Sequence, residues 1–335
     1  MAEAGADVDC VGPVEIRNIH TGHVSLRGLD LVPPQVGPAL TITDCTGGVF
    51  RDGCSMAGHG LPLFVAGPAA LVEDAAAVTF SGCTFGVTPG TGPYPGLEQR
   101  DSHVSLFGCD VRGGDGVLGL SGGAGVVVRG GTLFTSGSAL RGGAGADGTV
   151  TPPFDLCSDG RAGGAGIVLS AIGAATEPVV RHVETDFLGG PGGAAGGAAC
   201  NPGPSGPAID AAFGSMFALP GAARHLLVTS PIREGKQGSL TIVGPPGDHV
   251  WFVASFAQSH AFVDALNGTS LPTLDQTVIP LGPLPPNGVL HAELTVPVHP
   301  SVDSIALMEQ VLHWSPFTGF GAGAPRLGVI LDQQF

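Results

Sequence analysis

Short stretches in which apolar and polar residues alternate recur through residues 1–220, each followed by a small or glycine turn and a second short stretch. The copies read VSLRGLDL (24–31), VFRDGCSM (49–56), VTFSGCTF (78–85), VSLFGCDV (104–111) and VVVRGGTL (126–133), with a weaker copy VRHVETDF at 180–187. A period of two is typical of β-strands, and no helical period separates the copies. Strands repeated every 22–29 residues predict a solenoid of stacked coils.

Alignment of the copies places five residues at one position of the repeat: Leu29, Cys54, Cys83, Cys109 and Gly131. Consecutive coils stack as parallel strands about 4.8 Å apart, and a full coil provides the crossover that parallel strands need. We therefore expect an all-β chain with a parallel β-helix of about seven coils over residues 1–218. Within it, Cys54, Cys83 and Cys109 should form a stacked ladder of reduced thiols packed as small hydrophobes. Disulfide pairing and metal binding are the alternatives for this ladder.

Glycine-rich stretches interrupt the repeat at 86–96, 113–125, 141–166 and 189–207. They lack residues able to bury a core, so they should leave the coils either as stacked extended arms in polyproline II-like geometry or as mobile surface loops. Cys157 and Cys200 lie in the two longest stretches, and a disulfide between them would tie neighbouring loops together.

The pattern changes near residue 220. Residues 1–220 hold 45 of the 57 glycines and every cysteine, whereas both tryptophans, Trp251 and Trp314, come later. Six or seven short strands over the remaining residues predict an antiparallel β-sandwich at 219–335. The stretch SIALMEQVLHW (304–314) fits both the helical and the strand period, and its strand neighbours favour a strand.

Composition narrows the class of protein. Hydrophobic residues reach 43% and charged residues only 12%, which argues against a disordered chain in spite of its glycine content. The net charge is −15, with a single lysine and no arginine cluster, so neither a nucleic acid nor an anionic membrane surface is an expected partner. No apolar run is long enough to span a bilayer.

Catalytic chemistry is hard to find in this pattern. Hydrolysis of a glycosidic bond needs two positioned carboxylates, and β-elimination needs a base beside Ca²⁺ that is held by carboxylate oxygens. The nearest approach is a loose column on the strand that precedes each repeat: Asp44, Glu73, Asp74, Glu98, Arg100, Asp101 and His103. The column is either an ordinary solvated face or a weak site for a sugar or Ca²⁺. The sequence indicates no catalytic residue, no metal site outside this column and no other cofactor.

The segment GPVEIRNIHTGHVSLRGLDL (12–31) and the coils after it resemble right-handed parallel β-helix proteins that bacteria secrete, which share the fold of pectate lyases. SPIREGKQGSLTIVGPPGDHVWFVASF (230–256) looks like the β-sandwich that often follows the helix in such proteins. The resemblance implies a secreted or cell-surface protein. The opening MAEAGADVDC has neither the basic nor the apolar region of a signal peptide, so we expect one to have been removed or to lie upstream.

The function expected from these features is that of a non-catalytic extracellular structural or surface protein. Strand edges at the ends of a solenoid are templates for association, so self-assembly into a homo-oligomer or filament belongs to this expectation. The alternative is a polysaccharide lyase, a glycoside hydrolase or a polysaccharide-binding protein of the β-helix type. A binding module would use Trp251, Trp314 or Tyr94 as stacking platforms, although the two tryptophans alternate with predicted core positions.

Overall fold

The computed structural model describes residues 8–32, 37–59, 67–88, 90–151, 156–256, 258–272, 276–296, 298 and 304–332. The chain forms two compact units. The solenoid unit comprises Met1–Leu133, Ser138–Arg181 and Thr185–Phe217. The C-terminal unit comprises Phe134–Gly137, His182–Glu184 and Ala218–Phe335. No helix in the described ranges has both the length and the apolar character needed to cross a membrane.

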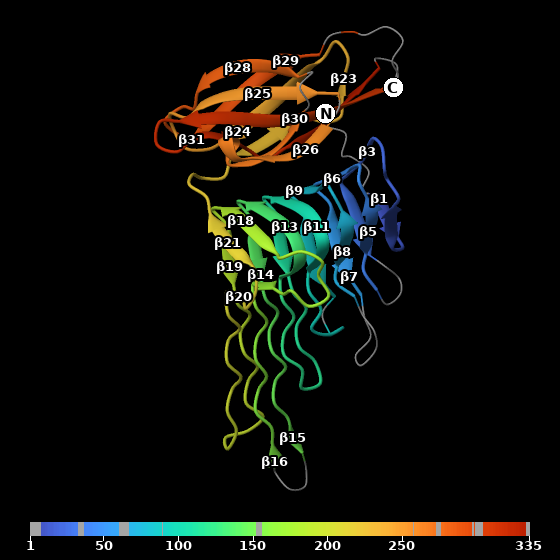
Figure 1. Ribbon diagram of the computed structural model, residues 1–335, viewed down its shortest axis with the longest axis vertical. Coiled ribbons are helices and arrows are strands. Elements are labelled where there is room, and N and C mark those ends of the chain that lie inside the picture. The colour runs from blue at the N-terminus through green and yellow to red at the C-terminus, as the bar shows by residue number, and fades with distance from the viewer. Residues whose placement is uncertain are drawn as a thin grey trace. The chain divides into compact units, whose positions relative to one another are not determined.

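The solenoid unit is built on two parallel sheets (Figure 1). The first sheet has seven strands in chain order: β1 (Val8–Val11), β4 (Leu29–Val32), β7 (Ser55–Gly58), β10 (Thr84–Val87), β12 (Asp110–Arg112), β14 (Ala139–Arg141) and β19 (Asp186–Leu188). Every printed pairing in this sheet is parallel.

The second sheet has twelve strands. Its main path runs through β2 (Val14–Arg17), β5 (Leu40–Cys45), β8 (Ala70–Ala75), β11 (Leu97–Phe107), β13 (Val126–Ser136), β17 (Ile167–Leu169) and β20 (Ile209–Ala211). Beside this path lie β3 (His23–Arg27), β6 (Gly48–Asp52), β9 (Val78–Ser81), β18 (Val179–Val183) and β21 (Ser215–Ala218). The predicted parallel solenoid is thus confirmed. Strand pairing establishes about four turns, and the count of about seven coils stays a prediction.

The strand register corrects one position of the repeat alignment. Asp110 pairs with Ala139, so the residue that follows Cys109 in the column is Ser138 and not Gly131. Residues 126–133 do not form a strand, a turn and a second strand, because β13 runs through Gly130 and Gly131 as one eleven-residue strand. The first residues of β13 belong instead to the main path of the second sheet, between β11, which begins at Leu97, and β17, which begins at Ile167.

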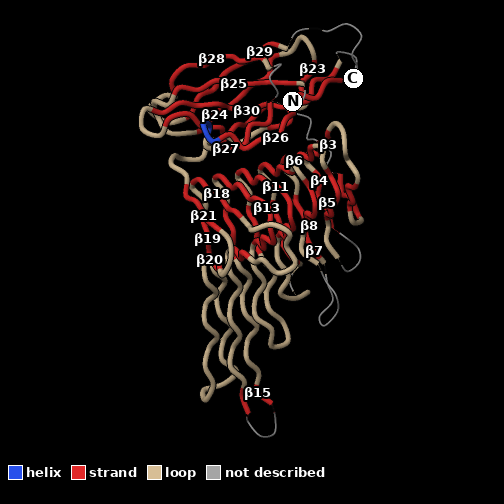
Figure 2. Tube along the Cα trace, viewed as in Figure 1, coloured by secondary structure: helices blue, strands red, loops and turns tan. Residues whose placement is uncertain are grey.

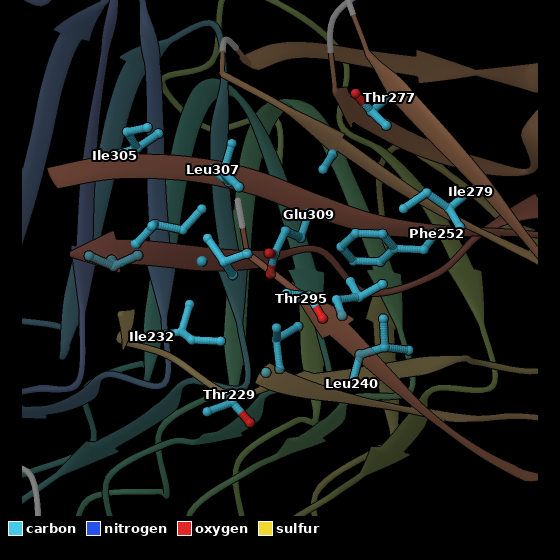
Figure 3. Close-up of a pocket in the computed structure, with 18 of the residues that line it drawn as sticks. Thr229, Ile232, Leu240, Phe252, Thr277, Ile279, Thr295, Ile305, Leu307 and Glu309 are labelled. Carbon is cyan, nitrogen blue, oxygen red and sulfur yellow. The ribbon is translucent and has the colours of Figure 1, made fainter. Parts of the chain in front are cut away.

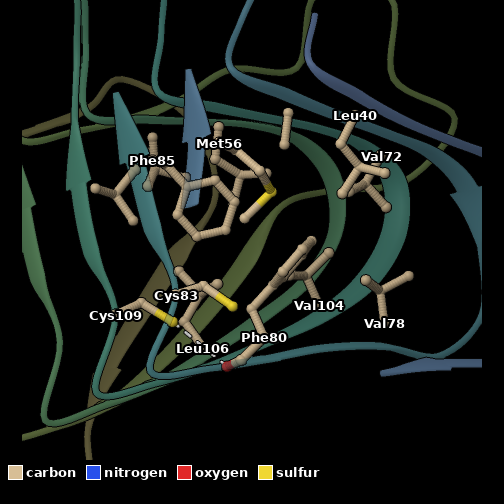
Figure 4. Packing of buried hydrophobic residues seen from close by; sticks show 14 of the residues in the cluster. Leu40, Met56, Val72, Val78, Phe80, Cys83, Phe85, Val104, Leu106 and Cys109 are labelled. Carbon is tan, nitrogen blue, oxygen red and sulfur yellow. Dashed lines mark hydrogen bonds between the residues drawn. The ribbon is translucent and has the colours of Figure 1, made fainter. Parts of the chain in front are cut away.

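Glycine is required before each column residue because the chain turns a corner there. Gly53, Gly82 and Gly108 have φ values of 61°, 59° and 58°, a left-handed conformation that costs side-chain-bearing residues energy. The residue after the turn then points into the interior, where Cys54, Cys83 and Cys109 are at most 2% exposed. Figure 4 shows Cys83 and Cys109 within the apolar cluster beside Phe80, Phe85 and Leu106.

The C-terminal unit consists of antiparallel sheets with one added parallel pair. A three-stranded sheet contains β22 (His225–Val228), β24 (Gln237–Val243) and β29 (Val289–Thr295). A six-stranded sheet contains β23 (Ile232–Arg233), β32 (Arg326–Leu331), β30 (Ser304–Ser315), β25 (His249–Ser255), β28 (Thr277–Pro283) and β31 (Gly319–Ala322). A hairpin joins β26 (Gln258–Val263) to β27 (Gly268–Pro272), with a 3-10 turn, η1, at Asp264–Leu266 between them.

Side chains from the three-stranded and the six-stranded sheet form one apolar cluster. Leu240 and Ile242 contribute from β24, and Val250 and Phe252 from β25. The strand predicted at 304–314 is confirmed as β30. The longest segment of the C-terminal unit begins at Ala218. Closure of the two sheets as a β-sandwich stays a prediction.

Candidate functional site

The predicted acidic column separates into two sets of residues with different roles. Asp44, Asp74 and Asp101 occupy one corner of successive coils, and all three have left-handed φ values, of 51°, 50° and 41°. Asn18 begins the same column with a φ of 58°. Asp and Asn tolerate this conformation better than other side-chain-bearing residues do. The left-handed backbone at this corner therefore accounts for the presence of Asp44, Asp74 and Asp101 without a bound ligand.

Asp101 additionally fixes a distant loop. Its carboxylate accepts hydrogen bonds from the N–H groups of Ala175 and Thr176 at 2.9–3.0 Å and from the Thr176 hydroxyl at 3.0 Å. Burial opposes ionisation of this carboxyl, but the hydrogen bonds outweigh it and lower the pKa of Asp101. A carboxylate with these partners holds the loop between β17 and β18 in place.

The remaining acids form an ion-pair network that crosses coils. Glu98 Oε1 lies 2.9 Å from Arg100 and 2.9 Å from Nε of Arg129, and Arg100 also lies 3.5 Å from Glu73. Burial lowers the pKa of Arg100, but Glu98 and then Glu73 outweigh it and raise the pKa of this guanidinium. Glu98 is only 7% exposed and bridges two cations, an arrangement that joins neighbouring strands.

His103 stands apart from both sets, because its Nδ1 lies 2.6 Å from the Thr132 hydroxyl on β13. Sequence reasoning missed Arg129, since the repeat alignment placed it inside the repeated phrase VVVRGGTL and the charged column was sought only on the strand before that phrase. Within the described ranges, no three His, Cys, Asp or Glu side chains gather into a group that could hold a metal ion. The predicted Ca²⁺ or sugar site in this column stays untested.

The thiol column makes the same hydrogen bonds on each coil. Cys54, Cys83 and Cys109 donate to carbonyl oxygens of the preceding coil at 3.4–3.7 Å, those of Leu26, Arg51 and Phe80. The Ser138 hydroxyl continues the series to Leu106 at 3.5 Å. A hydrogen bond to Cys83, together with burial, raises the pKa of Cys54, and burial raises the pKa of Cys83. Raised pKa values keep the Cys54 and Cys83 thiols protonated and poor nucleophiles.

The glycine-rich stretches form ordered arms (Figure 2). Outgoing arms leave the first sheet at 112–117, 141–151 and 188–197, and returning arms reach the second sheet through 92–96, 120–125, 158–166 and 201–208. Hydrogen bonds between arms replace the internal bonds that extended chains lack. This set of seven arms, called the arm bundle below, corresponds to the stacked-arm alternative and not to mobile loops.

One chain of six backbone hydrogen bonds links all seven arms, alternating between outgoing and returning ones. It runs from the N–H of Gly206 through Gly190, Gly164, Gly143, Gly123 and Gly114 to the carbonyl oxygen of Tyr94, with every N–O distance 2.8 Å. A parallel chain links Gly203, Gly193, Arg161, Ala146 and Leu120 at 2.8–3.1 Å. The arms are therefore crosslinked at successive levels three residues apart.

The spacing of these bonds defines three positions per turn of each arm. First-position residues such as Gly142 and Gly145 donate to the next arm in the same direction, at Leu188 and Pro191. Second-position residues such as Gly143 donate to an arm of opposite direction. Third-position residues such as Pro191 accept from the preceding arm, and this position tolerates proline because no described carbonyl oxygen of another arm accepts its N–H.

Aspartate at the third position caps the neighbouring arm. Oδ1 of Asp115, Asp147 and Asp159 accepts the N–H of Ala144, Ala194 and Asn201, at 2.8, 2.6 and 2.7 Å. Sequence reasoning did not identify these residues, although their recurrence in glycine triplets was the available signal. Near the far end of the arms, Cys157 and Cys200 form a disulfide with a Cα–Cα distance of 6.0 Å. The short strands β15 (Val150–Thr151) and β16 (Leu156–Cys157) pair beside it.

The C-terminal unit contains an apolar cavity of about 360 Å³. Its wall includes Leu240, Phe252, Ile279 and Leu307, and the carboxylate of Glu309 lies among them (Figure 3). Glu309 is 7% exposed. A cavity of this size and character can accommodate a small apolar molecule.

Aromatic side chains gather on the surface of the same unit. The His249 and Trp314 rings lie 6.0 Å apart, and those of Trp251 and Phe320 lie 6.1 Å apart. Trp314 and Phe320 are 36% and 51% exposed, so Trp314 is not the core residue that its alternation suggested, whereas Trp251 is half-buried. Tyr94 lies in the first returning arm and is not part of this group.

Neither a protein-family model nor a curated protein matches the chain.

Proposed function

We propose that the protein is a non-catalytic extracellular structural protein of the secreted bacterial β-helix type. In this proposal a right-handed solenoid of about seven coils and a β-sandwich carry a rigid arm bundle that is presented to the surroundings. The observation that carries the proposal is the chain of six hydrogen bonds from Gly206 to Tyr94. Such crosslinking gives glycine-rich segments a fixed shape, which a display element needs and a flexible linker does not.

The charged column supports a structural role. Glu98 lies between two guanidinium groups and Asp101 holds a loop, so both carboxylates have structural partners. Polysaccharide hydrolysis would need one carboxyl group as acid and another as base or nucleophile. Self-association through the ends of the solenoid is part of this proposal.

The disulfide supports an extracellular or cell-surface location. Cys157 and Cys200 join two arms near their far end, and such bonds persist mainly in oxidising compartments. Fractionation of the producing cells, with thiol labelling before lysis, tests this. We expect the protein outside the cytoplasm with both cysteines oxidised. A cytoplasmic protein with Cys157 and Cys200 reduced would overturn the proposal.

A second candidate is polysaccharide binding, favoured by the exposed rings of Trp314 and Phe320. Aromatic faces offer large rigid contact area at protein surfaces. Binding to neutral and acidic polysaccharides should be compared for the unaltered protein and Trp314→Ala, with Phe256→Ala as the matched control at another exposed ring. Loss of binding in Trp314→Ala alone would favour this candidate. Turnover of any polysaccharide, with or without Ca²⁺, would instead favour the enzyme alternative.

A further inference from the structure

The last coil of the solenoid ends in apolar side chains. Ile209 on β20 is the register partner of Ile167 on β17. Ile167 is fully buried, whereas Ile209 is 43% exposed. A core position has thus become a surface position, because β20 lies at the end of its sheet. Solenoids normally need a polar outer face on a terminal repeat for solubility.

Other apolar residues accompany Ile209 on this coil. Leu188 at the end of β19 is 48% exposed, Phe213 before β21 is 55% exposed and Phe217 on β21 is 49% exposed. Among the described strands, β19 pairs only with β14, and β21 only with β18. Strand edges and apolar side chains therefore occur together, a combination that promotes association with another chain.

The arm bundle also ends at this coil, with backbone N–H groups that no described arm accepts. Gly189 and Gly192 hold the first position of the last outgoing arm. In the preceding outgoing arm, Gly142 and Gly145 use that position to donate to Leu188 and Pro191 at 2.9 Å. No described residue accepts the N–H of Gly189 or Gly192.

The returning arm ends in the same way. Ser205 precedes Gly206 as Gly163 precedes Gly164, and the N–H of Gly163 donates to Pro204 in the next arm at 3.0 Å. Ser205 belongs to the last of the described returning arms, and no described residue accepts its N–H. Solenoid and arm bundle thus end together in an edge with unused donors at three-residue spacing.

We propose that this edge, formed by β19, β20, β21 and the arms at 188–197 and 201–208, is the docking surface for a second copy of the same chain. The proposal rests on the structural role proposed above and specifies its partner. The occupant is an edge of the same kind because the first coil that the structure describes carries no arm: only Gly12 and Pro13 separate β1 from β2. The arm bundle of one copy is extended only if the arms of another copy pack against its last arms. Contact between two identical surfaces closes as a dimer and does not propagate.

Charge makes the association sensitive to salt. The exposed carboxylates of Asp186 on β19 and Asp210 on β20 would approach their own copies across such a contact. The chain also carries a net charge of −15. Salt screens like-charge repulsion between surfaces, so raising the ionic strength should tighten the dimer.

Light scattering coupled to gel filtration, over a concentration series at low salt and at about 0.5 M salt, tests the proposal. We expect the mass to rise from one chain to two, at lower concentration in high salt. The double variant Ile209→Asp/Phe217→Asp should remain a monomer. Ile172→Asp is the matched control and should dimerise normally, because Ile172 is 72% exposed in the loop between β17 and β18.

A second variant keeps the test valid if the double variant misfolds. Ser205→Pro removes one N–H group from this edge. Proline should be tolerated there because Ser205 is exposed and because the φ of proline matches that of an extended arm. It should weaken dimerisation at least threefold while preserving the circular dichroism spectrum. A monomer at all concentrations and salts, a dimer indifferent to both variants, or growth beyond two chains would each overturn the dimer. A monomer found outside the cytoplasm would leave the proposed structural role intact.

Discussion

Gly164 approaches Gly123 so closely that a Cβ atom added to Gly164 would lie 1.9 Å from the carbonyl oxygen of Gly123. The φ of Gly164 is not in the left-handed region, so glycine is needed there for contact between arms and not for a turn. The same is true of Gly143 and Gly190, where the nearest carbonyl oxygens would lie 2.0 and 1.9 Å away. Backbone-to-backbone contact is what the glycine content of the arms makes possible.

Gly164→Ala should therefore loosen the arm bundle. A Cβ atom must displace backbone on the neighbouring arm, and overpacking of this kind costs about 1–3 kcal/mol. Hydrogen exchange should show faster exchange of the Gly164 and Gly190 N–H groups, with the solenoid strands unchanged. Gly86→Ala on β10 is the matched control, because its added Cβ atom would meet nothing within 4 Å. Equal effects of the two substitutions would contradict the role given to Gly164.

Removal of the disulfide should affect the arms more than the solenoid. Cys157 and Cys200 are 43 residues apart, and closing a loop of this length restricts the unfolded chain by about 4 kcal/mol in the chain-entropy model. The double variant Cys157→Ser/Cys200→Ser should unfold at lower denaturant concentration and lose exchange protection first around Asn201, whose N–H bonds to Asp159. Protection lost equally in β8 and β11 would show that the disulfide supports the whole unit.

The buried thiols should be unreactive in the folded protein. Cys45, Cys54, Cys83 and Cys109 are buried and reduced, and the raised pKa values of Cys54 and Cys83 disfavour the reactive thiolate. In a Cys10→Ser background, an aromatic disulfide reagent should label no thiol before denaturant is added and four afterwards. Rapid labelling of any of the four under native conditions would contradict the interior placement of the column.

The C-terminal unit should lose stability in mild acid. Burial, with a smaller contribution from Arg224, lowers the pKa of His313 to about 3, while Asp248 opposes the shift. Between that value and the usual 6.5 the unfolded chain binds more protons, so stability is complete above pH 6.5 and falls as the pH drops toward 3. The loss is at most about 5 kcal/mol.

Urea unfolding at several pH values measures this dependence. His313→Gln should flatten the curve between pH 3 and 6.5, whereas His291→Gln, at an exposed ring that bonds to Thr241, should leave it unchanged. An identical slope in the unaltered protein and His313→Gln would show that other groups cause the acid sensitivity.

The solenoid was predictable because its signal repeats. Gly82 and Gly108 recur at the same corner, and the residue after each faces the interior, so a single sequence shows both the period and the inward position of Cys83 and Cys109. The alignment failed at Gly131, where one long strand contains the same valine and glycine letters that elsewhere mark a strand and a turn.

The roles of the charged residues could not be deduced from composition alone. Asp101 and Glu98 are close in sequence, yet one bonds to Thr176 on a distant loop and the other to Arg129 on the next coil. Those partners depend on coil lengths that the irregular insertions obscure. The stacking of the arms depends likewise on the register between them, that is, on which glycine lies against which carbonyl oxygen. In the sequence, only the three-residue spacing of Gly142, Gly145 and Gly148 indicates this register.

The capping of Ala194 by Asp147, and of Ala144 by Asp115, has a consequence for how these arms can change over evolution. Each arm repeats its contacts every three residues, so an insertion of one or two residues would rotate every later glycine away from the carbonyl that it must meet. Whole triplets, added to an outgoing arm and to the returning arm beside it, would preserve every contact. Arm length is therefore a stepwise variable, adjustable one turn at a time without altering the solenoid that bears it.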